Sequence, residues 1–197
     1  MTDDGDKGQT EEYSQATRRA VMFTSVLASS MAFIDATALN VILPAIQSDL
    51  NASGSHLLWI LNAYALVLSA LLIVGGSLGD RFGCKRIFMY GIAVFTVASV
   101  MCGMTNGILP MIAARVLQGV GGALMIPGSL AMITEFYSPA HRGKAIATWT
   151  LFSVITSSIG PILGGVLSEM GWWRGVFFLN VPLALIALVV LYRNVPR

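Results

Sequence analysis

The chain has 197 residues, of which 55% are hydrophobic and only 11% are charged, and its formal net charge is +2. A soluble domain carries about 25% charged residues, so this composition excludes an ordinary soluble fold and indicates a membrane protein. The small, scattered positive charge excludes a nucleic-acid-binding surface. Cys84 and Cys102 have neither disulfide nor metal-ligand spacing, and His56 and His141 are isolated, so no metal or cofactor is expected.

The N-terminal stretch is polar and acidic, which predicts a disordered tail over residues 1–17. Residues 18–197 are predicted to form one transmembrane bundle. The apolar run that follows Arg18 and Arg19 is longer than the roughly 7–15 apolar residues of a signal peptide and lacks a clear cleavage site. We therefore expect this run to be retained as the first helix.

Six apolar stretches are long enough to cross a bilayer, which takes about 20 residues of helix. Pro44 and Pro110 are expected to mark helix ends at the first and fourth stretches, since proline interrupts helical hydrogen bonding. The expected spans are residues 21–43, 57–78, 87–105, 111–134, 146–167 and 176–192.

The placement of lysine and arginine predicts the orientation of the bundle. With the N-terminus in the cytoplasm, ten of the 12 lysines and arginines fall in cytoplasmic segments, whereas Arg174 is outside and Arg115 lies within a span. Cytoplasmic loops are the ones enriched in these residues. We therefore expect an inner-membrane protein with both termini in the cytoplasm.

Each group of three consecutive spans carries one ionisable residue inside its first helix, Asp35 in one group and Arg115 in the other. The two groups have opposite topology, as in transporters built from inverted repeats. The fold expected from the six spans is an all-α membrane protein of six transmembrane helices, and the charge placement suggests that they form two inverted three-helix repeats without carrying that conclusion by itself.

Asp35 and Arg115 are also the residues that the membrane makes most expensive. A charge at the bilayer centre costs at least about 2.5–3.5 kcal/mol, so such residues usually face the bundle interior and are functional. At 1.5 Å per residue, Asp35 lies about 13 Å inward from Pro44 and Arg115 about 7 Å inward from Pro110, so both fall at similar depth. We expect them to pair as a proton-sensitive switch. The simpler explanations are a static ion pair, or an Arg115 that snorkels to the outer interface.

One face of the fourth span combines polar groups with small residues. Arg115, Gln118, Gly119 and Gly122 share this face at helical spacing. It can pack closely and still present a cation and an amide. A small-residue packing seam, which is common in membranes, explains the glycines equally well.

The fifth span contains Gly160, Pro161, Gly164 and Gly165, with Ser153, Thr156 and Ser157 preceding them. Glycines at positions 160 and 164 permit close helix approach, and Pro161 favours a kink.

Residues 76–86 are expected to form a cytoplasmic loop between the second and third spans. The pattern places an acid beside bases and a glycine turn, and its key residues are Gly76, Asp80, Arg81, Gly83, Lys85 and Arg86. We interpret it as a conformational latch in which Asp80 can bind the next helix N-terminus or a partner arginine. Positive-inside charge alone explains Lys85 and Arg86 but not the whole pattern.

Taken in order, these motifs resemble those of the major facilitator superfamily, specifically the N-terminal half of a drug:proton antiporter of the fourteen-helix type. The resemblance covers the chain from the first span to its end. It rests on the loop at residues 76–86, the first-span residues Asp35, Asn40 and Pro44, the fourth-span face, the glycine–proline run of the fifth span, and Trp173, Arg174, Phe177, Asn180 and Pro182 at the sixth.

Three positions depart from the family pattern. Cys84 stands where the loop motif usually has arginine, which weakens the expected latch. Thr156 replaces the first glycine of the antiporter motif, and Gly175 replaces a tryptophan. The residues expected to couple protons are all present.

The resemblance implies proton-coupled export of small amphipathic or cationic compounds, and no enzymatic activity. It also implies a second helical bundle, so the expected partners are a missing C-terminal half or a second copy of this chain, besides the substrate, protons and lipid. In the bundle alone, Asp35, Gln118 and Ser157 are expected to face lipid. A proton symporter for nutrients and a non-transporting membrane partner subunit are the alternatives. An enzyme is disfavoured because the sequence has no catalytic cluster.

Overall fold

The computed structural model describes residues 13–196, and helices make up nearly all of this part of the chain. Six helical segments within it are long and apolar enough to cross a membrane, with α6 and α7 together forming the last, which confirms the predicted number of spans. The helices are α1 (Gln15–Leu50), α2 (Gly54–Phe82), α3 (Cys84–Met104), α4 (Ile108–Phe136), α5 (Pro139–Glu169), α6 (Gly175–Phe178) and α7 (Asn180–Asn194).

Helix α1 is longer at both ends than the sequence predicted. It begins at Gln15, where the Ser14 side chain caps the backbone N–H of Thr17, so the helix starts before the end of the predicted tail. Most of that tail, residues 1–12, lies outside the described residues. The prediction that Pro44 ends the helix is wrong, because α1 continues to Leu50. A proline removes a single helical hydrogen bond, which a long packed helix tolerates.

Pro110 and Pro182 lie at helix starts, unlike Pro44. Pro110 lies in the first turn of α4, where its missing N–H would have had no helical partner anyway. Pro182 lies in the first turn of α7, directly after the break at Leu179 that separates α6 from α7. The sixth span is therefore two helical pieces, whereas the sequence predicted one continuous helix.

The junction between α2 and α3 is much tighter than the predicted loop of residues 76–86. Gly76, Asp80 and Arg81 belong to the last turns of α2, whereas Lys85 and Arg86 belong to the first turn of α3. Gly83 alone separates the two helices, and its φ of +97° is a conformation that favours glycine. One residue in that conformation is sufficient to reverse the chain.

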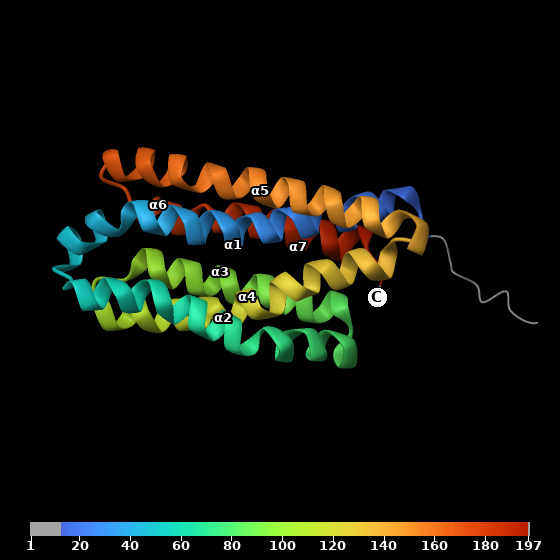
Figure 1. Ribbon diagram of the computed structural model, residues 1–197, viewed down its shortest axis with the longest axis horizontal. Coiled ribbons are helices and arrows are strands. Elements are labelled where there is room, and N and C mark those ends of the chain that lie inside the picture. The colour runs from blue at the N-terminus through green and yellow to red at the C-terminus, as the bar shows by residue number, and fades with distance from the viewer. Residues whose placement is uncertain (1–12, 197) are drawn as a thin grey trace, which may run out of the picture.

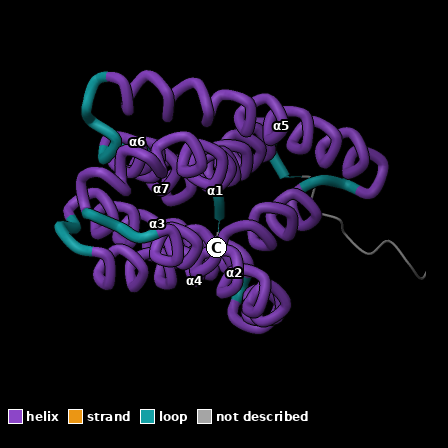
Figure 2. Tube along the Cα trace, turned by 60° about the vertical axis from the view of Figure 1, so that its left-hand side comes forward, coloured by secondary structure: helices purple, strands orange, loops and turns teal. Residues whose placement is uncertain are grey.

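The helices pack in two layers, and each layer mixes residues from both halves of the sequence. Helix α1 packs against α5 and α7, whereas α4 packs against α2 and α3. Figures 1 and 2, which view the bundle from two directions, show the layer of α1, α5 and α7 lying beside the layer of α2, α3 and α4. The first helix of each three-helix repeat, α1 or α4, therefore packs in the layer formed by the second and third helices of the other repeat. This exchange is expected of two inverted three-helix repeats. The exchange brings α1 and α4 together at the centre of the bundle.

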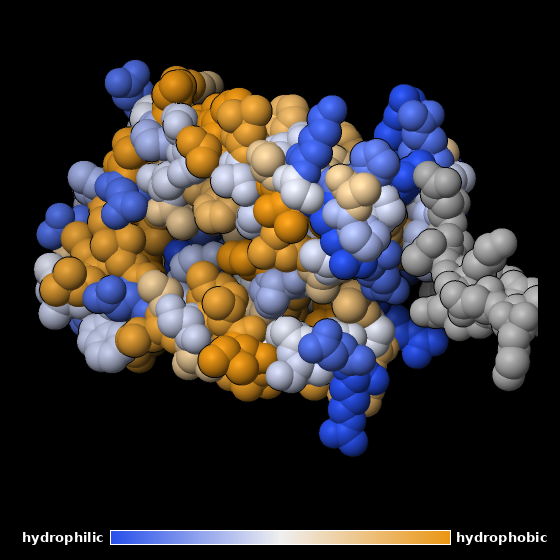
Figure 3. Space-filling model, turned by 45° about the vertical axis from the view of Figure 1, so that its right-hand side comes forward, coloured by the Kyte–Doolittle hydropathy of each residue, from blue (hydrophilic) through white to orange (hydrophobic). Residues whose placement is uncertain are grey.

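The surface of the bundle matches a hydrocarbon environment. Apolar residues cover the middle of the face in Figure 3, and hydrophilic ones gather toward its ends. The most exposed large hydrophobic side chains include Ile73 of α2 and Leu109 of α4, which are 83% and 79% exposed. Such exposure is stable only where lipid replaces water.

A glycine of α2 allows that helix to approach α4 closely, and its neighbour does not. A Cβ atom added at Gly75 would lie 2.0 Å from the carbonyl oxygen of Ala123, whereas a Cβ atom at Gly76 would meet nothing within 4 Å. The sequence pattern singled out Gly76, but the close approach belongs to Gly75.

Substitution of these two neighbours should therefore have opposite effects. We expect Gly75→Ala to lower the free energy of unfolding by about 1–3 kcal/mol through overpacking against α4. The matched control Gly76→Ala should leave it unchanged or raise it by up to about 1 kcal/mol, because alanine favours helix more than glycine. Unfolding by SDS in mixed micelles, followed by circular dichroism, measures both. Equal effects of the two substitutions would contradict the packing described here.

Candidate functional site

Asp35 of α1 and Arg115 of α4 form an ion pair in the centre of the bundle. The Arg115 Nη1 atom lies 2.5 Å from Asp35 Oδ2, and each residue is only 1% exposed. The expected pairing is confirmed. The expectation that Asp35 and Gln118 face lipid is wrong, because α4 covers Asp35 and Gln118 is fully buried.

Arg115 is held by several groups and does not reach the membrane interface. Its Nη1 also donates to Gln118 Oε1 at 2.5 Å, and its Nε donates to the carbonyl oxygen of Ile60 at 3.3 Å. The ring of Tyr64 lies against the guanidinium, with its centroid 4.5 Å from Cζ. The snorkelling explanation for Arg115 is therefore wrong, and α2 supplies part of the arginine's environment.

Gln118 connects the ion pair to the third and sixth spans. Its Nε2 donates to Asp35 Oδ1 at 2.8 Å and to Ser99 Oγ at 3.0 Å. Ser99 donates its own hydrogen to the carbonyl oxygen of Phe95 and accepts a second bond from Asn180 Nδ2 at 3.1 Å. Because Ser99 can only accept from the two amides, the NH₂ group of Gln118 must face Ser99 and Asp35, and its oxygen must face Arg115.

The resulting network joins α1, α2, α3, α4 and α7, and it leaves no buried side-chain nitrogen or oxygen unpaired among the residues that the structure describes. Asp35, Arg115 and Gln118 were expected from the sequence. Ser99 was missed, and its only signal was a hydroxyl group within a largely apolar span. Asn180 belonged to the motif at the sixth span, where no role was assigned to it.

Chemically, the network is a carboxylate that can accept a proton, held by a cation and an amide that depend on its charge. Protonation of Asp35 would remove the charge that attracts Arg115 and leave a buried guanidinium without its counter-ion. Such a site is costly in one charge state and stable in the other. It is therefore suited to driving a rearrangement of α1 against α4.

The small-residue face of α4 packs against α2 directly beside the ion pair. A Cβ atom at Gly119 would lie 2.8 Å from the carbonyl oxygen of Tyr64, and one at Gly122 would lie 3.2 Å from a side-chain atom of Leu68. The packing-seam explanation of these glycines is thus supported by the structure. The same helix face presents Arg115 and Gln118 to the polar network, so the two explanations hold together.

The predicted antiporter motif of α5 packs against the segment of α1 that carries Asp35. A Cβ atom at Gly160 would lie 2.9 Å from the carbonyl oxygen of Ile34, and one at Gly164 would lie 2.8 Å from that of Ala38. Gly165 makes only an ordinary contact at 4.0 Å, and Pro161 lies inside the helix. The two glycine contacts bracket Asp35, so a movement of α5 would displace the helix that carries the acid.

The predicted latch residues lie at a different place from the ion pair. Asp80, Arg81, Gly83 and Arg86 are exposed at the end of the bundle where α1 begins and α7 ends (Figure 1). Lys85 donates to the carbonyl oxygen of Val195, directly after α7. The structure therefore connects this motif with the sixth span, a contact that the sequence did not indicate.

A second ion pair closes the opposite end of the bundle. Arg174 Nη1 lies 2.5 Å from Asp49 Oδ2, and Arg174 Nη2 donates to the carbonyl oxygen of Thr105 at 2.9 Å. Trp173 donates to the same carboxylate at 3.3 Å. These contacts hold the segment before α6 against the ends of α1 and α3. Asp49 was not singled out in the sequence.

Comparison with solved structures shows the fold. A bacterial homolog of the human lysosomal transporter Spinster, in an inward-facing conformation, matches with a TM-score of 0.79 at 22% identity over 94% of this chain and 45% of that chain. The D-xylose–proton symporter matches with a TM-score of 0.74 at 18% identity, over 91% of this chain and 48% of that one.

Curated relatives show sequence similarity over most of the chain. The methylenomycin A resistance protein of Bacillus subtilis is 35% identical over 96% of this chain and 41% of its own length. The tetracenomycin C resistance and export protein of Streptomyces glaucescens is 41% identical over 81% of this chain and 30% of its own. The riboflavin transporter RibZ of Clostridioides difficile is 30% identical over 85% of this chain and 37% of its own length.

This chain therefore spans less than half the length of each of these relatives. The family model described as Major Facilitator Superfamily matches residues 25–197, which include all six spans except the start of the first. The predicted family is confirmed: the chain belongs to the major facilitator superfamily of membrane transporters.

Proposed function

We propose that this chain is the proton-coupling part of an exporter of small amphipathic or cationic compounds. The observation that carries the proposal is the buried network in which Asp35 is bound by both Arg115 and Gln118. Asp35 carries the only buried carboxylate among the described residues, so this side chain is the natural acceptor for a proton within the membrane.

In the proposed cycle, a proton from outside binds Asp35 and breaks its charge pairing with Arg115. Gln118 can follow either partner, because its oxygen faces the arginine and its NH₂ group faces the acid. Helices α1 and α4 then separate at this point, and α5 moves with α1 through the contacts at Gly160 and Gly164. Release of the proton to the cytoplasm restores the ion pair.

The substrate path is proposed to form only in a larger assembly. The chain spans less than half the length of the relatives described above, and α2 and α5 leave large apolar side chains uncovered. A further helical bundle, or a second copy of this chain, would complete the path. In that assembly, the junction between α2 and α3 is proposed to act as a cytoplasmic latch. Its residues are Gly76, Asp80, Arg81, Gly83, Lys85 and Arg86.

Export is favoured over import because two of the relatives carry resistance names, one of them with the word export. A nutrient symporter remains the second candidate, since another relative is named a riboflavin transporter. We place the protein in the inner membrane with both termini in the cytoplasm, on the basis of its lysine and arginine distribution.

Everted membrane vesicles test the direction and the coupling together. Vesicles that contain the chain, alone or together with the C-terminal bundle of a relative, should take up a cationic dye when their interior is made acidic, and a protonophore should abolish the uptake. Proton-driven loss of the dye from preloaded vesicles would support the symporter instead. Uptake no greater than in vesicles without the chain, both for the chain alone and when it is expressed with a C-terminal bundle of a relative, would contradict the proposal.

A further inference from the structure

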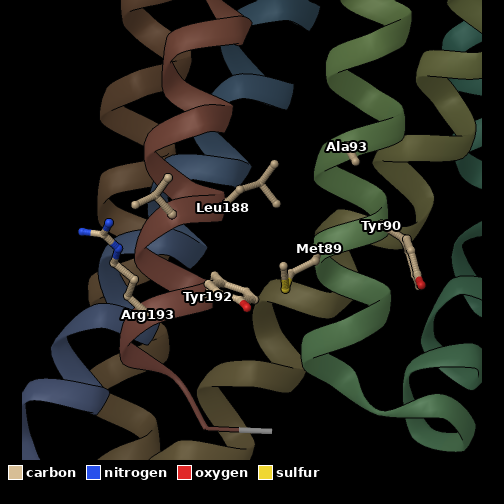
Figure 4. A pocket seen from close by; sticks show the side chains of 7 residues that line it. Met89, Tyr90, Ala93, Leu188, Tyr192 and Arg193 are labelled. Atoms are coloured by element: carbon tan, nitrogen blue, oxygen red, sulfur yellow. The ribbon is translucent and has the colours of Figure 1, made fainter.

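An open groove of about 590 Å³ lies between α3 and α7, close to the end of the bundle where α7 ends. Its volume falls within the roughly 300–1,000 Å³ typical of small-molecule sites. Helix α3 contributes Met89, Tyr90 and Ala93, and α7 contributes Leu188, Val189, Tyr192 and Arg193. Figure 4 shows Met89, Leu188 and Tyr192 between the two helices, whereas Tyr90 and Arg193 extend away from each other on the outer sides of α3 and α7. None of these residues belongs to the ion-pair network.

The walls of the groove are apolar, and basic residues of both helices lie beside the end of the groove where α7 ends. On α7, Arg193 lies near the helix end, Tyr192 lies beside it, and Leu188 lies one turn farther into the bilayer. On α3, exposed Arg86 precedes Tyr90 by one turn on the same helix face, and Ala93 follows another turn on. Both helices therefore present a cation, then a tyrosine, then small or aliphatic side chains.

This order matches the chemistry of a phospholipid. Tyrosine is enriched at the level of lipid headgroups, and apolar side chains below it would contact an acyl chain. The two tyrosines are 63% and 73% exposed, so their hydroxyl groups are accessible from the membrane. Arginine binds phosphate oxygens through paired N–H groups.

The charge of the two helices selects among phospholipids. Helices α3 and α7 contain Lys85, Arg86 and Arg193 but no aspartate or glutamate. Basic sites between transmembrane helices favour anionic headgroups. We propose that the groove between α3 and α7 binds an anionic glycerophospholipid, with one acyl chain along Met89 and Leu188 and its headgroup at the end of the groove, where Arg86 and Arg193 flank it on the two helices.

Lipid titration of the purified, delipidated full chain tests this proposal, with native mass spectrometry as the readout. We expect phosphatidylglycerol to bind at least tenfold more tightly than phosphatidylcholine with the same acyl chains. The double variant Arg86→Gln/Arg193→Gln should weaken phosphatidylglycerol binding by about 25-fold, or about fivefold for each arginine. The control Arg142→Gln removes the same charge from α5, which does not line the groove, and should bind phosphatidylglycerol as the unmodified chain does.

A second measurement uses the unmodified chain and so does not depend on the folding of variants. Phosphatidylglycerol with a photoreactive acyl chain should label Met89 and Leu188 in preference to Ile73 and Leu109, which are more exposed to lipid. Equal affinity for the two lipids, undiminished binding by the double variant, or labelling that simply follows exposure would each overturn the proposal. If a second copy of the chain covered the groove, it would exclude the lipid. Binding would then be undiminished in the double variant, and labelling would follow exposure. Because both readouts are lipid binding, they are independent of whether the chain transports.

Discussion

Replacement of Asp35 by asparagine should reduce proton-driven dye uptake to the level of vesicles without the protein. Asparagine has nearly the same shape and can still accept a hydrogen bond from Gln118, but it can neither bind a transported proton nor neutralise Arg115. The change therefore removes the proposed chemistry with little loss of volume. Dye uptake in everted vesicles, normalised to the amount of folded protein, measures the effect.

Asp49→Asn is the matched control, because Asp49 is the other described carboxylate of the same helix. It pairs with Arg174, but its side chain is 46% exposed, and exposed ion pairs contribute only about 0–1 kcal/mol. This variant should retain transport. Asp35→Glu, which keeps the acid but lengthens the side chain, should transport at a reduced rate. Undiminished proton-driven uptake by Asp35→Asn would exclude Asp35 as the coupling residue.

Replacement of Arg115 by glutamine should lower the free energy of unfolding by about 3–5 kcal/mol, the usual cost of removing one partner of a buried ion pair. The loss arises because Asp35 stays buried without its counter-ion, with Gln118 as its remaining partner. SDS-induced unfolding in mixed micelles, followed by circular dichroism, measures the change.

A double-mutant cycle separates the ion pair from general packing. The variant Asp35→Asn/Arg115→Gln contains no buried charge at this position, so it should be less destabilised than the sum of the two single variants by about 1–3 kcal/mol. The same cycle on Asp49 and Arg174, whose side chains are 46% and 27% exposed, should show a coupling of at most about 1 kcal/mol. Additive effects at Asp35 and Arg115 would mean that their interaction contributes nothing beyond packing.

The pairing of Asp35 with Arg115 was predictable because the membrane makes an isolated charge so costly that two opposite charges at similar depth should meet. The remaining members of the network were not predictable in this way. A serine such as Ser99 satisfies its hydroxyl on its own helix, so its presence in a span carries no penalty and indicates no partner. Its role depends on Gln118 and Asn180 reaching it from two other helices.

The class of fold, the number of spans and the family were all predictable from the sequence. These follow from properties of single segments, namely the length of apolar runs, the cost of buried charge and the order of motifs along the chain. Three other features follow only from the packing of the helices: α1 and α4 exchange layers, Gly75 and not Gly76 allows the close approach to α4, and α1 continues past Pro44. The groove between α3 and α7 also exists only in three dimensions. The physical reason is that lipid favours any apolar helix equally, so the rotation and neighbours of each helix depend on side-chain packing between segments far apart in the chain.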